Sequence, residues 1–130
     1  MSTEIFLLAG SIVLGFVHIV LASHAASWQR GYRWTAGPRD DNVPPLTGVA
    51  GRLARASQNF LETFPFFAAA ILAAHVTGRE GVLTLWGAQL YVWARLVYLP
   101  LYAFGVPLAR SLTWNVAAVG IFLIVAALFV

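Results

Sequence analysis

The chain has 130 residues, of which 60% are hydrophobic and only 10% are charged. Soluble domains carry about 25% charged residues, so this composition excludes an ordinary water-soluble domain and indicates an integral membrane protein. The net charge of +3 comes from a small excess of arginine over acid rather than from a basic patch, which argues against a nucleic-acid partner. Because the chain has no cysteine, disulfides, thiolate metal ligands and a thiol nucleophile of the protein itself are excluded.

Four apolar segments of membrane-spanning length follow one another along the chain. They cover approximately residues 4–28, 49–76, 82–102 and 108–130. An α-helix rises 1.5 Å per residue, so about 20 residues cross about 30 Å of hydrocarbon. The sequence therefore predicts an all-α membrane protein, a four-transmembrane-helix bundle that forms a single domain over residues 1–130. We expect the first segment to be a retained helix rather than a cleaved signal peptide, because its start carries Glu4 and no cation.

Arginines are concentrated in the connections at one end of the predicted bundle. The first loop holds Arg30, Arg33 and Arg39, and Arg110 follows the third loop, whereas the second turn has only Arg79. Cationic loops stay on the cytoplasmic side, so the first and third loops are expected there and both termini on the outer side. The compact form and the absence of an organelle signal indicate a bacterial inner membrane. Most of the first loop, which is rich in turn-forming residues, is expected to be a solvated connector.

Two predicted helices each carry a stripe of polar side chains at i, i+4 and i+7, a spacing that places each stripe on one helix face. On the second helix the stripe comprises Arg55, Asn59 and Glu62, and on the third helix it comprises Tyr91, Arg95, Tyr98 and Tyr102. A charged residue inside a membrane helix costs about 2.5–3.5 kcal/mol on insertion scales and normally faces a bundle interior or a wet cavity. We therefore expect the two stripes to face a common ligand cavity.

The same residues also permit a purely structural interpretation. Glu62 and Arg95 would pair across two helices as a buried ion pair, with Asn59 as an interhelical hydrogen-bonding group. Such a pair leaves Arg52, Arg55 and the tyrosines on the same faces without a role. The ligand cavity is therefore the favoured interpretation.

The three histidines do not have the spacing of a metal site. His18, His24 and His75 provide no i, i+4 pair on one helix, and carboxylate partners are lacking. We therefore predict no metal, and we expect these side chains to be hydrogen-bonded within the protein or to lie at the membrane interface.

The polar pattern resembles the MAPEG family, the membrane-associated proteins in eicosanoid and glutathione metabolism. Two motifs carry the resemblance: Arg55-x-x-x-Asn59-x-x-Glu62-x-x-Pro65, and Ala94-Arg95-x-x-x-x-x-x-Tyr102 followed by Arg110. The resemblance covers nearly the whole chain, since length, number of spans and placement of polar residues all agree. Val97 and Thr63 stand where leukotriene-synthase-like members carry Arg and Tyr, so the microsomal glutathione transferase pattern is the closer match.

The resemblance implies a homotrimer that binds glutathione as co-substrate between neighbouring subunits, in a cavity open to the cytoplasmic side. Transferred by position, the glutathione-binding residues would be Arg30, Arg55, Asn59, Glu62, Arg95, Tyr98 and Tyr102. Arg110 would be the catalytic residue that stabilises the thiolate. The residue types suit this ligand, because arginines hold its two carboxylates and Glu62 suits its ammonium group.

The expected function is therefore that of a glutathione transferase or peroxidase acting on hydrophobic electrophiles or lipid hydroperoxides. Its partners would be membrane lipid, a small hydrophobic electrophile and further copies of the chain. Two other functions fit the same residues. One is a non-catalytic membrane scaffold or accessory subunit, and the other is a lipid-binding module that uses the cavity for an anionic headgroup.

Overall fold

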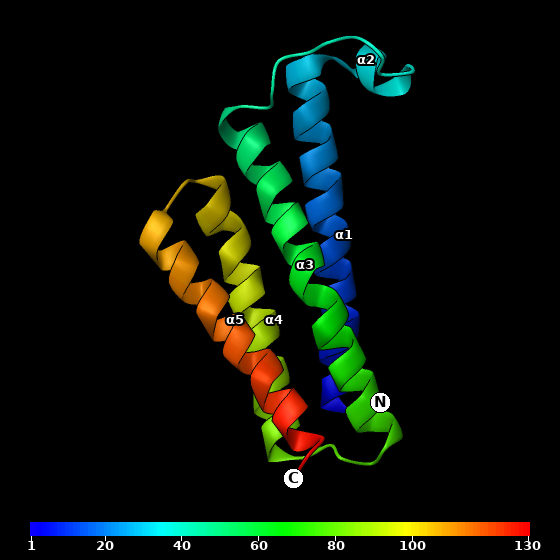
Figure 1. Cartoon of the computed structure of the whole chain (residues 1–130), viewed down its shortest axis with the longest axis vertical. Helices are drawn as coiled ribbons and strands as arrows, with labels where there is room; N and C mark the ends of the chain where they lie inside the picture. The colour runs from blue at the N-terminus through cyan, green and yellow to red at the C-terminus, as the bar shows by residue number, and fades with distance from the viewer.

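The computed structural model describes residues 1–130 and consists of helices without strands (Figure 1). The long helices are α1 (Thr3–Arg30), α3 (Gly48–Val76), α4 (Val82–Ala103) and α5 (Pro107–Ala127), and α2 (Tyr32–Ala36) is a short helix within the first loop. All four long helices have the length and apolar composition needed to cross a membrane. The prediction of an all-α membrane protein with a four-transmembrane-helix bundle is confirmed.

The helices associate as two neighbouring pairs, α1 with α3 and α4 with α5 (Figure 1). The first loop, α2 and the α4–α5 turn lie at one end of the bundle, which we call the loop end. Both termini and the α3–α4 turn lie at the other, the terminal end (Figure 1). The arginines of the first loop and Arg110 therefore share the loop end, as the count of four spans requires.

Two helix boundaries differ from the sequence-based ones by more than one residue, for identifiable reasons. Helix α1 continues past Trp28 to Arg30 and stops at Gly31. The φ of Gly31 is +94°, a backbone conformation that glycine adopts at little cost. Helix α5 ends at Ala127 instead of reaching Val130, and its last residues form a turn. The residues after Ala127 are apolar, so hydropathy places them in the membrane span. The helix nevertheless ends where the regular backbone hydrogen bonds end.

Helices α4 and α5 touch through their backbones at Gly87 and Gly120. A Cβ atom added to Gly87 would lie 2.5 Å from the carbonyl oxygen of Gly120, and one added to Gly120 would lie 2.6 Å from that of Gly87. Small residues permit this close approach, which drives helix association in membranes through van der Waals packing. This contact fixes where α5 runs along α4.

The first loop is mostly exposed, as expected for a solvated connector, and hydrogen bonds hold it against the end of α1. The side chain of Gln29 donates to the carbonyl oxygen of Pro45 at 3.1 Å and accepts from the backbone N–H of Thr47 at 2.9 Å. The hydroxyl groups of Ser27 and Thr35 lie 2.9 Å apart and join α1 to α2. These contacts hold the start of α3 against the end of α1.

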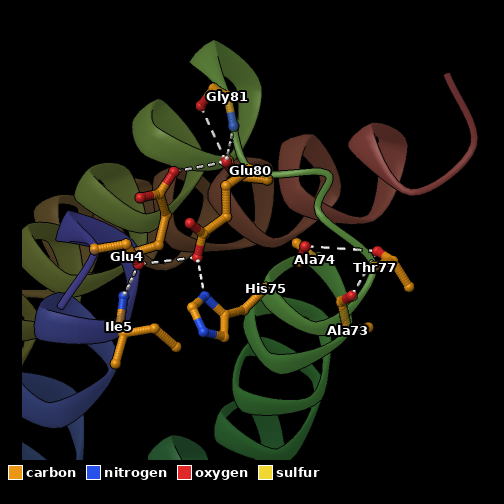
Figure 2. Close-up of polar contacts among 10 residues, drawn as sticks. Glu4, Ile5, Ala73, Ala74, His75, Thr77, Glu80 and Gly81 are labelled. Carbon is orange, nitrogen blue, oxygen red and sulfur yellow. Dashed lines mark hydrogen bonds and ion pairs between the residues drawn. The ribbon is translucent and has the colours of Figure 1, made fainter.

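At the terminal end, the buried carboxylate of Glu4 joins α1 to α4 (Figure 2). Thr84 donates from its hydroxyl to Glu4 Oε1 at 2.7 Å, and the same hydroxyl accepts from the backbone N–H of Gly81 at 2.7 Å. Thr84 therefore satisfies a free amide at the start of α4 and a buried carboxylate of α1 at once.

Beside it, Glu80 in the α3–α4 turn accepts from Ser2 at 2.9 Å and lies 2.9 Å from His75 Nδ1 (Figure 2). Ser2 in turn caps α1 by accepting from the backbone N–H of Ile5. Partial burial acts to raise the pKa of Glu80, but the hydrogen bonds from His75 and Ser2 outweigh it, so this pKa lies below its ordinary value. Glu80 thus fastens the N-terminus to the α3–α4 turn.

We expect Gly120→Ala to destabilise the protein by about 1–3 kcal/mol, because the new methyl group would overlap the backbone of α4. The measurement is thermal unfolding in detergent. Gly10→Ala is the matched control, since nothing lies within 4 Å of the added Cβ at that helical position. Equal melting temperatures for the two variants would contradict the backbone contact.

We further expect acid to remove the contribution of Glu80 to stability. Because its pKa is depressed in the folded protein, that contribution is present above about pH 4.5 and is lost as the pH falls through the folded-state pKa. Melting temperatures of the wild type and Glu80→Gln should therefore differ at neutral pH and converge in acid. A constant difference across the titration would disprove the linkage.

Candidate functional site

The polar stripes of α3 and α4 face each other toward the loop end. Arg55 donates from Nε to the hydroxyl of Tyr102 at 3.2 Å, and Arg95 donates from Nη1 to Asn59 Oδ1 at 2.7 Å. Each stripe lies on one face because its members are three or four residues apart on a helix. Two successive contacts thus join the helices, between residues four apart on α3 and seven apart on α4.

Tyr102 lies between two arginines that come from different helices. The guanidinium carbon of Arg110 is 4.7 Å from its ring centroid and that of Arg55 is 5.9 Å away. Tyr98 meets Tyr102 edge to face, with 5.5 Å between ring centroids. The α4–α5 turn makes this possible, because Gly105 takes a φ of +73° and the chain returns at once into α5. The tyrosines of α4 and the arginine of α5 therefore form one cluster.

Next to this cluster is a polar pocket of about 260 Å³ between α3, α4 and α5. Its lining consists of Asn59, Tyr98, Arg110, Ser111, Trp114 and Asn115. Ser111 and Asn115 are additions to the residues predicted from sequence. Their signal was an i, i+4 polar pair directly after Arg110 in an otherwise apolar span, and Asn115 Nδ2 donates to the carbonyl oxygen of Ser111 at 2.9 Å. The polar surface thus continues onto α5.

Arg95 does not line the pocket but is completely buried behind it. Its guanidinium carbon lies 4.1 Å from the ring centroid of Tyr98 and 5.3 Å from that of Phe60. Aromatic faces attract a desolvated cation, so these rings take the place of a carboxylate. The alternative Glu62–Arg95 ion pair is not formed, because Arg95 bonds to Asn59 instead and Glu62 is exposed. Arg95 therefore holds pocket residues in place from within the bundle.

The loop end has a strong excess of positive charge. Arg52 donates to the carbonyl oxygen of Ala103 at 2.8 Å, so it also points to the α4–α5 turn. The one contact of salt-bridge length in the chain joins the His75 ring and the Glu80 carboxylate at the terminal end. Hence Arg52, Arg55, Arg95 and Arg110 have no carboxylate partner. Such a site attracts an anionic ligand, which arginine recognises through charge-assisted hydrogen bonds.

Glu62 lies halfway along α3, on the wall of a second and larger space. This is an apolar groove of about 800 Å³ between α3 and α5. Besides Glu62, its lining includes Phe66 and Ala70 from α3 and Ile121 from α5. Trp114 lines both the groove and the polar pocket, so the two spaces adjoin. An apolar molecule in the groove would therefore lie beside a polar molecule in the pocket.

Arg30 lies apart from the other predicted site residues. Its guanidinium carbon is 5.0 Å from the ring centroid of Trp34, and its Nη2 donates to the carbonyl oxygen of Pro44 at 3.3 Å. It thereby helps to hold the first loop and makes no hydrogen bond to the pocket within one chain. The chain brings together Arg55, Asn59, Arg95, Tyr98, Tyr102 and Arg110, while Arg30 and Glu62 stay outside this cluster.

Comparison with known protein families identifies the family of the chain. The model of the MAPEG family matches residues 7–130, so the match includes every site residue described above. No curated protein matches the chain. The family identified from the two polar motifs is thus confirmed by a match over almost the full length. The chain belongs to the MAPEG family.

Proposed function

We propose that the protein binds glutathione and conjugates it to hydrophobic electrophiles, or uses it to reduce lipid hydroperoxides. The observation that carries this proposal is the group of arginines without carboxylate partners beside a small polar pocket. Glutathione has two carboxylates, one ammonium group and a thiol. It therefore offers the negative charge that the loop end lacks, and it supplies the thiol that a chain without cysteine cannot provide.

The residues of the two stripes fit the parts of this tripeptide. Arg55 is exposed and bonds to Tyr102 through Nε, which leaves its terminal nitrogens for a carboxylate. From Arg55 to Glu62 the helix rises about 10 Å, a distance that an extended tripeptide covers. Glu62 is the single acid on this face and would accept from the ammonium group. The ligand would then lie along α3, with its thiol toward α5.

Arg110 and the tyrosines would activate that thiol. An ordinary thiol has a pKa near 8.5, and a guanidinium or hydroxyl group close to the sulfur favours the reactive thiolate. Arg110 lines the pocket beside Tyr98 and lies over the ring of Tyr102. The thiol would lose its proton to solvent, and the thiolate would attack an electrophilic carbon, forming the carbon–sulfur bond while the leaving group departs with the electron pair of the broken bond. With a hydroperoxide, the thiolate would attack the terminal oxygen and break the O–O bond, releasing the alcohol, and a second glutathione would convert the resulting sulfenic acid to the disulfide and water. The adjoining apolar groove would hold the hydrophobic partner.

We also propose that the complete site lies between subunits of a homotrimer. Glu62 is an exposed carboxylate halfway along a membrane span, where contact with lipid is costly. A neighbouring subunit over the α3–α5 groove would enclose Glu62 and bring a second set of side chains, such as Arg30, to the ligand. By the distribution of arginines, the site would open to the cytoplasm of a bacterial cell.

An anionic lipid headgroup would satisfy the same arginines, so the tests must separate it from a thiol ligand. A headgroup has no sulfur and would produce no thiolate absorbance. The scaffold alternative is weakened because the interhelical Glu62–Arg95 pair on which it rested is not formed.

We expect the purified protein to bind glutathione and Arg55→Ala to weaken binding by about 10- to 150-fold, as for the loss of a charge-assisted hydrogen bond. Isothermal titration calorimetry measures both. Arg79→Ala is the matched control, because Arg79 contacts the Val130 carbonyl oxygen at the terminal end. An absence of glutathione binding by the wild type, with anionic lipid retained through purification, would support the headgroup ligand instead.

We expect Arg110→Ala to reduce kcat at least tenfold more than it reduces glutathione affinity, because its charge acts on the thiolate rather than on the bound thiol. Ultraviolet absorbance of the thiolate at neutral pH should fall in parallel. Arg110→Lys keeps the charge and should recover part of both signals. Equal losses of affinity and kcat would assign Arg110 to binding alone.

A further inference from the structure

His18 of α1 is buried among the helices with both ring nitrogens lacking a hydrogen-bond partner. The expectation of a hydrogen-bonded or interfacial histidine is therefore wrong at this position. Its ring stacks instead on Phe60 of α3, with 4.9 Å between centroids and 28° between planes. The contact that fixes this imidazole is an aromatic one.

Gly15 of α1 faces the same phenylalanine. A Cβ atom added at Gly15 would lie 2.7 Å from Cε1 of Phe60, so the ring occupies the space left by the missing side chain. Gly15 and His18 are three residues apart and lie on one face of α1. Together they form a seat for the Phe60 ring, which we call the α1 seat.

Phe60 connects the α1 seat to the pocket through Arg95. The guanidinium carbon of Arg95 is 5.3 Å from the centroid of the Phe60 ring. Arg95 itself lies over the ring of Tyr98 and donates to Asn59. Asn59 and Tyr98 line the polar pocket beside Arg110, whereas the α1 seat does not reach it. A continuous series of contacts thus runs from α1 through the core to the pocket wall.

We propose that Gly15 and His18 are positioning residues for the polar pocket. They fix the Phe60 ring, which in turn fixes Arg95, and Arg95 sets the positions of Asn59 and Tyr98. Residue 18 must carry a flat, uncharged ring for this role. A positively charged ring at this position would repel the nearby guanidinium of Arg95. The expected effect of changes at Gly15 and His18 on glutathione affinity rests on the proposed function. Their expected effect on the geometry of the pocket does not.

The test exploits the absence of cysteine in the chain. Ser111→Cys, labelled with a trifluoromethyl group, places a fluorine probe in the pocket wall. Val119→Cys places the same probe on an exposed position of α5 outside the pocket, as a reference. Fluorine NMR in detergent then reports the pocket geometry without any ligand.

We expect His18→Ala to shift the Ser111 probe, to leave the Val119 probe unchanged and to weaken glutathione binding by roughly tenfold. His18→Phe keeps a neutral ring and should restore the probe position and affinity to within about twofold of wild type. Leu7→Ala is the control for loss of packing, because Leu7 is a buried residue of α1 in a different apolar cluster. It should lower the melting temperature without moving the Ser111 probe.

Three outcomes would overturn the proposal: an unmoved Ser111 probe in His18→Ala, equal effects of His18→Ala and His18→Phe, or an equal shift in Leu7→Ala. Should His18→Ala fail to fold, Gly15→Ala would push the Phe60 ring away from α1 and must move the same probe. A shifted probe in a protein that binds no glutathione would support the positioning role and contradict the proposed function alone.

Discussion

The buried guanidinium of Arg95 is the group around which the rest of the bundle is organised. A cation inside a membrane span needs compensation, and here the faces of Tyr98 and Phe60 and the amide oxygen of Asn59 supply part of it, while Nε and Nη2 of Arg95 make no hydrogen bond. No carboxylate is used for this purpose. Had Glu62 turned inward to form the pair, both charges would have been neutralised in the core. Because aromatic rings hold Arg95, Glu62 remains free and the positive charge of the loop end remains uncompensated.

The two ends of the bundle consequently have different roles. At the terminal end, Glu4 and Glu80 each accept hydrogen bonds from other segments, so the carboxylates there are satisfied within the chain (Figure 2). Along the same half, Gly87 and Gly120 bring the backbones of α4 and α5 into contact. This half fixes the helix directions, and those directions determine that α5 presents its arginine beside the tyrosines of α4. The loop end can therefore keep unpaired charge without losing the fold.

Periodicity and hydropathy were sufficient for the spans and for the polar stripes, because both depend on properties of a single helix. The partner of each polar residue was not predictable in the same way. Whether Arg95 meets Glu62 or Asn59 depends on the rotation of α3 about its axis, and a difference of three residues corresponds to less than one helical turn. The first loop was correctly expected to be mostly exposed, but the hydrogen bonds of Gln29 to Pro45 and Thr47 were not predictable, because only the reversal of the chain brings these residues together. His18 gave no signal, since an isolated histidine in an apolar helix does not reveal that a phenylalanine will stack on it.

Two of the residues expected at the site, Glu62 and Arg30, lie outside the cluster in one chain for different reasons. Glu62 is exposed on the wall of the α3–α5 groove, whereas Arg30 packs on Trp34 of α2 and donates to a carbonyl oxygen of the first loop. A free carboxylate at mid-span is costly against lipid, whereas the two carboxylates at the terminal end, Glu4 and Glu80, accept hydrogen bonds within the chain. Within the single chain the exposed carboxylate of Glu62 is therefore unpaired. The proposed trimer would remove that cost, because a second copy over the α3–α5 groove and a ligand between the subunits would enclose Glu62.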